Sequence, residues 1–123
     1  MRIALATDVG GGTSYSMLRT AAEGYKVLQL NDQSWPAAEA FYQMTLGNAR
    51  ALSLDDRIGS IETGKEADLI ALDPHATPAL AHRIEAAGGD LEVELFALVA
   101  LGDDRAVRQT YVAGEPRKGR DSF

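Results

Sequence analysis

The chain has 123 residues, which suits one modest domain, and a formal net charge of −6. An acidic chain is a poor nonspecific binder of nucleic acid, because that binding depends on Lys and Arg neutralising phosphates. No apolar run approaches the roughly 20 residues that a helix needs to cross a bilayer, so no membrane partner is expected. The sequence contains no cysteine, which excludes disulfides and thiolate zinc sites and fits a cytoplasmic protein.

The chain opens with a short apolar stretch, residues 2–6, that predicts a buried strand of a parallel sheet. Because Met1 leads into only this short segment, no secretory signal is expected. Asp8 follows the segment, and the glycines Gly10, Gly11 and Gly12 come next. A strand that ends in a carboxylate and continues through a glycine turn into a helix is how a β/α barrel presents a metal ligand or a general base.

Two amphipathic helices are expected after the glycines. Over residues 14–30 apolar side chains recur at helical spacing, namely Met17, Leu18, Ala21, Tyr25 and Leu28. Pro36 favours the first turn of a second helix that runs to about Leu46. This helix is expected to bury Ala37, Ala40, Phe41 and Met44. Gly47 is expected to interrupt it, and a shorter helical turn should cover residues 48–52.

The second half of the chain predicts a sheet with two more helices. Residues 57–61 are expected to be extended, residues 62–65 to form a turn, and residues 67–72 to form a strand. Short helices are expected over residues 80–87 and 91–101. A terminal hairpin should follow over residues 106–117, with its turn at residues 113–115.

Three stretches of the sequence together resemble a known family. Residues 7–20 (TDVGGGTSYSMLRT) are similar to the last barrel strand and following loop of the guanine deaminases, a branch of the amidohydrolase superfamily. Residues 49–52 (ARAL) and 57–70 (RIGSIETGKEADLI) resemble the segment by which amidohydrolases leave the barrel and enter a small β-sandwich. Residues 101–107 and 111–114 resemble the family's closing segment. The first motif is specific to the guanine deaminase branch, whereas the second marks only the superfamily.

The resemblance implies an α/β fragment: the last β/α unit of an amidohydrolase (β/α)8 barrel, followed by the C-terminal part of the small β-sandwich domain. Residues 1–53 would hold the last barrel strand, the glycine loop and the following helices. Residues 54–123 would hold the C-terminal segment of the β-sandwich with its connecting helices. A complete β/α barrel needs on the order of 200 residues or more, so we expect this chain to be a piece of a larger enzyme.

The resemblance also implies a zinc-dependent hydrolase that converts guanine to xanthine and ammonia. Bound zinc lowers the pKa of its water to about 7, and Asp8 matches the family position that binds the metal and accepts the proton of that water. From residue type alone, Asp8 more often only caps the turn that follows it. The three glycines let the backbone turn out of the strand with a positive φ, which is expected to leave amide groups free beside the site. Such a loop before a helix is also able to cradle a phosphate, but the P-loop and dinucleotide-binding patterns are both missing from the sequence.

The family's other metal ligands have no counterpart in this sequence. Amidohydrolases take most of them from a His-x-His pair on the first barrel strand and from histidines on middle strands. Only His75 and His82 are present, both in the second half, and we expect both to be exposed and structural. A zinc site uses about four ligands. The chain alone is therefore expected to hold no zinc and to be catalytically incomplete.

Other polar and aromatic features favour structural roles. A purine pocket could use four aromatic residues, but their helical spacing predicts core positions for Trp35, Phe41, Tyr42 and Phe96. The acidic pairs at positions 55–56 and 103–104 are expected at helix ends or in loops. Arg50 and Arg57 are expected to pair with these acids, which says little about activity.

Three hypotheses of function remain open. The chain is the C-terminal portion of a guanine deaminase, or a small self-associating or partner-docking module without catalysis, or a distinct small enzyme built on the strand–glycine–helix unit. The extent of the resemblance favours the first. A barrel strand and helix without their neighbours leave an unpaired edge and an apolar face, so we expect a homo-oligomer or association with the missing barrel half.

Overall fold

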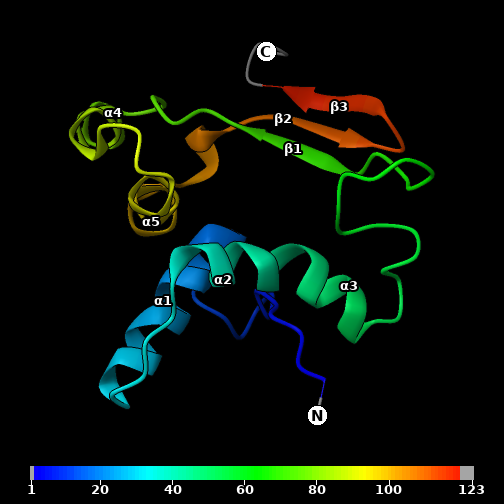
Figure 1. Cartoon of the computed structure of the whole chain (residues 1–123), viewed down its shortest axis with the longest axis horizontal. Coiled ribbons are helices and arrows are strands. Elements are labelled where there is room, and N and C mark those ends of the chain that lie inside the picture. Colours follow the sequence, from blue (N-terminus) through cyan, green and yellow to red (C-terminus); the bar gives the residue numbers. More distant parts are fainter. Residues whose placement is uncertain (1, 120–123) are drawn as a thin grey trace.

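A computed structural model describes residues 2–119 of the chain (Figure 1). Met1 and residues 120–123, the end of the expected second part, lie outside the described residues. The elements in chain order are α1 (Met17–Leu30), α2 (Ala37–Tyr42), a π-helical turn (Gln43–Gly47), α3 (Asn48–Ala51), β1 (Leu69–Leu72), α4 (Pro78–Ala87), α5 (Leu91–Leu101), a 3-10 turn (Asp104–Ala106), β2 (Val107–Val112) and β3 (Glu115–Gly119).

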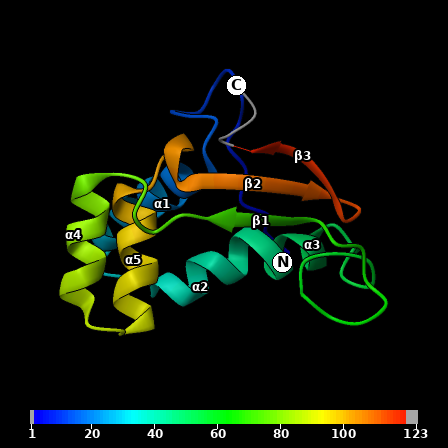
Figure 2. The ribbon, with the colours of Figure 1, turned by 90° about the horizontal axis from the view of Figure 1, so that it is seen from above.

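One small antiparallel sheet lies apart from most of the helices. β2 pairs with β1 on one side and with β3 on the other, so the strand order is β1-β2-β3. Figure 1 shows the sheet on one side of the molecule and α1, α2 and α3 on the other. Figure 2 shows α4 and α5 standing at one end of the strands. These two helices form the connection between the paired strands β1 and β2.

α5 is the central helix of the core, and it contacts α1, α2 and α4. Its sequence is apolar around most of its circumference, which is typical of a helix that packs on several sides. One buried cluster joins α4, α5 and the 3-10 turn through Leu80, Ile84, Ala97, Leu98 and Ala106. A second joins α1, α2 and α5 through Ala21, Ala22, Ala40 and Val99. Phe41 packs against both clusters, so the core is continuous.

Side chains cap the starts of the longer helices. The hydroxyl of Ser16 accepts a hydrogen bond from a backbone N–H of α1, and the hydroxyl of Thr77 accepts one from a backbone N–H of α4. The carboxylate of Asp90 accepts one from a backbone N–H of α5. α2 follows Pro36, which supplies no side-chain cap. The carboxylate of Glu92 instead accepts hydrogen bonds from the first backbone N–H groups of α2. The cap of α2 therefore comes from α5.

The expected helices are confirmed, with two differences. α1 begins at Met17 rather than at residue 14, because Ser16 is the residue that caps it. Gly47 does not interrupt the second helix, because its backbone stays in the right-handed helical region. The helix instead widens into a π turn and continues as α3. α5 lies where the sequence predicts it, and α4 and the terminal hairpin lie within two residues of their expected bounds.

Two expected extended pieces are not strands. Residues 2–8 form no strand in the described structure, because none of the described strands pairs with them; side chains of the second helix bond Ile3 and Leu5 instead. Residues 57–61 form turns and bends, since the backbone of Arg57 and Ile58 bonds back to Leu54. β1 begins at Leu69 rather than at residue 67, because Asp68 bonds the backbone N–H of Ala113 in the hairpin turn. None of the helices within residues 2–119 has the length and apolarity that a membrane crossing needs.

Candidate functional site

Asp8 lies in a tight turn at the end of the opening segment. Its φ of 49° is in the left-handed region, which Asp and Asn tolerate better than most residues. Its backbone carbonyl accepts hydrogen bonds from the N–H of Gly11 (2.9 Å) and of Gly12 (2.6 Å). The side chain of Asp8 is exposed. The turn therefore presents a carboxylate that groups from outside the chain are able to reach.

The glycines of this turn leave little room for a side chain at positions 11 and 12. A Cβ atom at Gly11 would lie 2.6 Å from Oδ2 of Asp8, and one at Gly12 would lie 1.9 Å from the carbonyl oxygen of Thr7. Gly10 has the positive φ, 97°, that the sequence predicts for the loop. The backbone is thus folded closely around the Asp8 carboxylate.

One expectation for the loop is wrong. The sequence predicts that the glycine amides stay free beside the site, but those of Gly11 and Gly12 both bond the carbonyl of Asp8. Two donors that a phosphate-binding loop would use are therefore already occupied. The structure gives no support to the phosphate alternative.

Two side-chain amides hold the segment that leads to Asp8. Asn48 accepts a hydrogen bond from the N–H of Leu5 (2.7 Å) and donates one to its carbonyl (2.8 Å). Gln43 donates to the carbonyl of Ile3 (2.9 Å). The Leu5 side chain also packs against the cluster between α1, α2 and α5. These contacts fix the opening segment to the helix made of α2, the π turn and α3.

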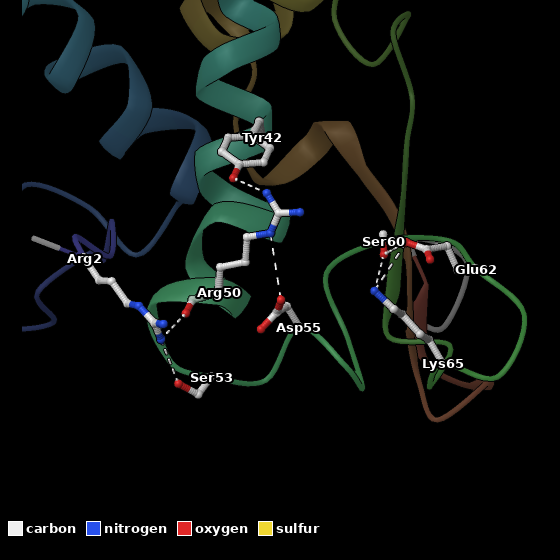
Figure 3. Close-up of polar contacts among 8 residues, drawn as sticks. All are labelled: Arg2, Tyr42, Arg50, Ser53, Asp55, Ser60, Glu62 and Lys65. Carbon is white, nitrogen blue, oxygen red and sulfur yellow. Dashed lines mark hydrogen bonds and ion pairs between the residues drawn. The ribbon is translucent and has the colours of Figure 1, made fainter.

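The opening segment and this helix line a pocket of about 310 Å³ at the Arg2 end of the segment. In its wall, the guanidinium of Arg50 lies 5.9 Å from the centre of the Tyr42 ring and donates to the Tyr42 hydroxyl (3.0 Å) (Figure 3). Arg50 also lies 3.8 Å from a carboxylate oxygen of Asp55. Arg2 donates to the carbonyl of Arg50 (3.3 Å) and to the hydroxyl of Ser53 (3.0 Å). Asp8 is not among the residues that line this pocket.

The polar residues of the loop before β1 bind one another. Lys65 donates to the hydroxyl of Ser60 (2.6 Å) and lies 3.3 Å from Glu62 (Figure 3). The hydrogen bond from Ser60, and after it the bond from Lys65, lowers the pKa of Glu62 below its ordinary value. Arg57 and Glu66 form a further ion pair at 2.5 Å. This part of the family motif therefore acts structurally, by ordering the loop.

Within residues 2–119 no group of three or more His, Cys, Asp or Glu side chains is placed to hold a metal ion. His75 and His82 are both exposed, as expected. Catalytic zinc sites usually take three ligands from the protein. Asp8 and its described neighbours therefore do not fit a zinc ion by themselves.

Three of the four aromatic candidates pack as expected. Trp35 and Phe41 lie against the buried clusters, and Phe96 meets Tyr25 edge to face with ring centres 5.1 Å apart. The core expectation is wrong for Tyr42, which is 43% exposed and lies beside Arg50.

The acidic pairs lie at turns, as expected. Asp103 begins the 3-10 turn, accepts a hydrogen bond from the backbone of Arg105 and pairs with its guanidinium at 2.6 Å. The bond from the Arg105 side chain is the main cause that lowers the pKa of Asp103. Asp55 pairs with Arg50 as expected, whereas Arg57 pairs with Glu66 instead of with an acid of either pair.

Gln43 and Asn48, the two residues that hold the opening segment, were not predicted from the sequence. Their spacing gives no signal, because the two carboxamides lie five positions apart. In a regular α-helix, positions five apart are not neighbours on one face. Only the π turn, which the sequence does not predict, brings these two together.

Comparison with known families agrees with this geometry. The profile of the Amidohydrolase family matches residues 1–117, which is nearly the whole chain. The chain belongs to the amidohydrolase family.

Within this family, the chain is similar to guanine deaminases. It is 45% identical to the guanine deaminase of Escherichia coli (strain K12) over 114 residues, which are 93% of this chain and 26% of the relative. It is 38% identical to the guanine deaminase of Homo sapiens over 126 residues, covering 94% of this chain and 27% of the relative.

Solved structures give the same result. The E. coli guanine deaminase superposes with a TM-score of 0.94 at 44% identity, over 98% of this chain and 28% of that chain. The guanine deaminase from Bradyrhizobium japonicum superposes with a TM-score of 0.88 at 30% identity, over 97% of this chain and 31% of that chain. The chain thus spans less than a third of the length of these relatives, and it corresponds to the C-terminal portion of the enzyme.

Proposed function

We propose that this chain is the part of a guanine deaminase that carries the catalytic carboxylate Asp8. In the assembled enzyme, guanine and water would give xanthine and ammonia. The observation that carries the proposal is the turn at Asp8, whose glycine backbone is folded so closely around the carboxylate that a Cβ atom at Gly11 would overlap it. The similarity to guanine deaminases covers the same turn.

Asp8 would act as a metal ligand and as a proton acceptor. Its carboxylate offers an oxygen to a metal ion, and its exposed position leaves it open to groups from outside the chain. Zinc is the metal that the family resemblance implies. Its other ligands would come from outside residues 2–119, because that range contains no ligand group of its own.

We also propose that residues 1–53 belong to the last β/α unit of a (β/α)8 barrel and residues 54–123 to the C-terminal part of the β-sandwich. The glycine turn between the opening segment and α1 supports the first assignment. The three-stranded antiparallel sheet supports the second. A cytoplasmic location, expected from the lack of cysteine, stays a prediction.

The proposal can be tested by adding the part of E. coli guanine deaminase that this chain does not match. Co-expression of that part with the chain should give an assembly that consumes guanine, followed by ultraviolet absorbance. Asp8→Asn keeps the size of the side chain and removes its charge and basicity. Because a positioned acid or base contributes about 100-fold or more to a rate, turnover should fall by at least that factor.

Asp32→Asn is the matched control for this test. Asp32 also has a left-handed φ, 55°, and an exposed side chain, but it follows α1 and lies outside the glycine turn. The Asp32→Asn assembly should keep the wild-type rate. An Asp8→Asn assembly that also turns over guanine at the wild-type rate would overturn the assignment of Asp8.

A further inference from the structure

The bonds between the opening segment and the second helix follow one edge of the segment. Gln43 bonds Ile3, and Asn48 bonds Leu5, two residues further on. In a strand, the backbone polar groups of residues two apart point to the same edge. The two carboxamides therefore bond one edge of the opening segment, and Asn48 satisfies both backbone polar groups of Leu5.

The π turn places the two carboxamides together. Asn48 donates its backbone N–H to the carbonyl of Gln43, which is the i to i+5 bond of a π turn. The Gln43 side chain then donates to Oδ1 of Asn48 (3.4 Å). This contact turns Oδ1 of Asn48 toward the N–H of Leu5 and leaves Nδ2 for the Leu5 carbonyl. Single π turns within α-helices are frequent at functional sites.

Leu5 is only three residues before Asp8. Three residues span at most about 10 Å, so little chain is available to absorb a shift at Leu5 before it reaches the carboxylate. The Leu5 side chain is also packed against the core. The position of Leu5 relative to the helix therefore determines where the turn at Asp8 begins.

We infer that Asn48 is the positioning residue for Asp8, because its carboxamide fixes the opening segment against the helix at Leu5. The inference rests on the proposed function, since Asn48 acts on the reaction only through Asp8. A displacement of about 1 Å at a reacting group can cost about 100-fold in rate, so a side chain that never touches guanine has a large effect on turnover.

Asn48→Ala tests the inference, with Asn31→Ala as its matched control. Both changes remove one carboxamide and introduce the residue with the highest helix propensity. Asn31 donates to the carbonyl of Val27 (2.8 Å) at the end of α1 and bonds none of residues 2–8. In the chain alone, Asn48→Ala should shift the backbone amide resonances of Leu5 and Asp8 and speed hydrogen exchange at Leu5 by at least about tenfold, which corresponds to about 1.4 kcal/mol. Asn31→Ala should leave both residues unchanged.

The same variants are then measured in the assembly with the E. coli part. Asn48→Ala should lower kcat for guanine at least about tenfold and leave KM within about twofold, while Asn31→Ala keeps both values. Asn48→Asp keeps the acceptor for the Leu5 N–H and loses the donor to its carbonyl, so it should shift the Asp8 resonance in the same direction.

The outcomes separate the two claims. The positioning role would be overturned if the Asp8 resonances were unshifted in both Asn48 variants. It would also be overturned if Asn48→Ala kept the wild-type kcat while Asp8→Asn was inactive. Either result would leave the proposed function standing. A wild-type kcat in Asp8→Asn would overturn the proposed function, and with it the role of Asn48 in the reaction.

Discussion

The carboxylate of Glu92, in the first turn of α5, caps the first turn of α2 by accepting a hydrogen bond from the backbone N–H of Ala37. Its second oxygen accepts from the N–H of Ala38 (3.2 Å). The negative charge also lies at the positive end of α2. Residues 37 and 92 fall in the two different parts that the sequence analysis expects, so this cap ties the parts together.

Glu92→Ala should destabilise the chain by about 1 kcal/mol, the usual cost of losing an N-cap. Glu94→Ala is the matched control, because Glu94 is in the same first turn of α5. The backbone N–H groups of Ala37 and Ala38 bond Glu92 and not Glu94. Urea unfolding of both variants measures the difference. Equal losses in the two variants would show that Glu92 acts only on α5.

Two neighbouring substitutions in the glycine turn should differ in effect: one should mainly lower stability and the other mainly lower guanine turnover. Gly12→Ala places a Cβ atom 1.9 Å from a backbone carbonyl, which cannot move alone, so it should destabilise the chain by about 1–3 kcal/mol. Gly11→Ala meets the end of the Asp8 side chain, which can rotate away. It should cost less than about 1 kcal/mol in stability but lower guanine turnover in the assembly.

A double variant checks the cause of the Gly11 effect. If the Cβ atom acts through the Asp8 carboxylate, Gly11→Ala should cost no further stability in an Asp8→Ala background. An equal cost in both backgrounds would place the strain in the backbone instead. Thermal unfolding of the single and double variants provides this comparison.

The pair of Asp103 and Arg105 predicts a pH-dependent contribution to stability. Arg105 holds the pKa of Asp103 below its ordinary value of 3.8, so folding favours the ionised carboxylate. The stabilisation is therefore fully present above about pH 4, and it is lost as the pH falls through the lowered pKa. Asp103→Asn keeps the oxygen that accepts from the Arg105 backbone, and it removes the charge together with the oxygen that accepts from the Arg105 guanidinium.

Thermal unfolding across the acid range measures this contribution. The wild-type chain should exceed Asp103→Asn by less than about 1 kcal/mol at neutral pH, because the pair is on the surface. The difference should shrink toward zero below the ordinary pKa of the carboxyl group. A difference that stays constant down to the lowest pH would contradict the electrostatic account.

Self-association of the isolated chain is the prediction that favours the second hypothesis, the docking module. Tyr15 is 82% exposed, Leu30 85% and Ile61 88%. The expected association rests on these side chains together with the apolar face that a barrel unit leaves without its neighbours. Sedimentation velocity should give a mass above the monomer, and Leu30→Lys should reduce it more than Gln29→Lys at the neighbouring exposed position. A monomer at every concentration would contradict the predicted association.

The sequence predicts the elements that depend on local pattern. The apolar circumference of α5, the helical spacing of apolar residues in α1 and the turn at Gly114 each depend on a few residues, and each is found in the structure. The opening segment differs, because a strand needs a partner that is distant in sequence. Its bonds go to Asn48, and no local pattern predicts that contact.

Part of the candidate site was predictable from local sequence patterns, and part was not. The motif around Asp8 places the carboxylate at a turn, and the structure finds it there. The glycine amides turn inward to the Asp8 carbonyl, because the tight turn brings them together. Tyr42 lies outward against Arg50, which is further along the same helix, so the core position expected from helical spacing holds for Phe41 and not for Tyr42.

The central claim is that the chain supplies Asp8 to a guanine deaminase site that it does not complete alone. Guanine consumption and zinc content should be measured for the isolated chain and for its assembly with the unmatched part of E. coli guanine deaminase. We predict zinc and turnover in the assembly, and neither in the isolated chain. Turnover of guanine by the isolated chain, with one zinc ion bound to each chain, would contradict the account.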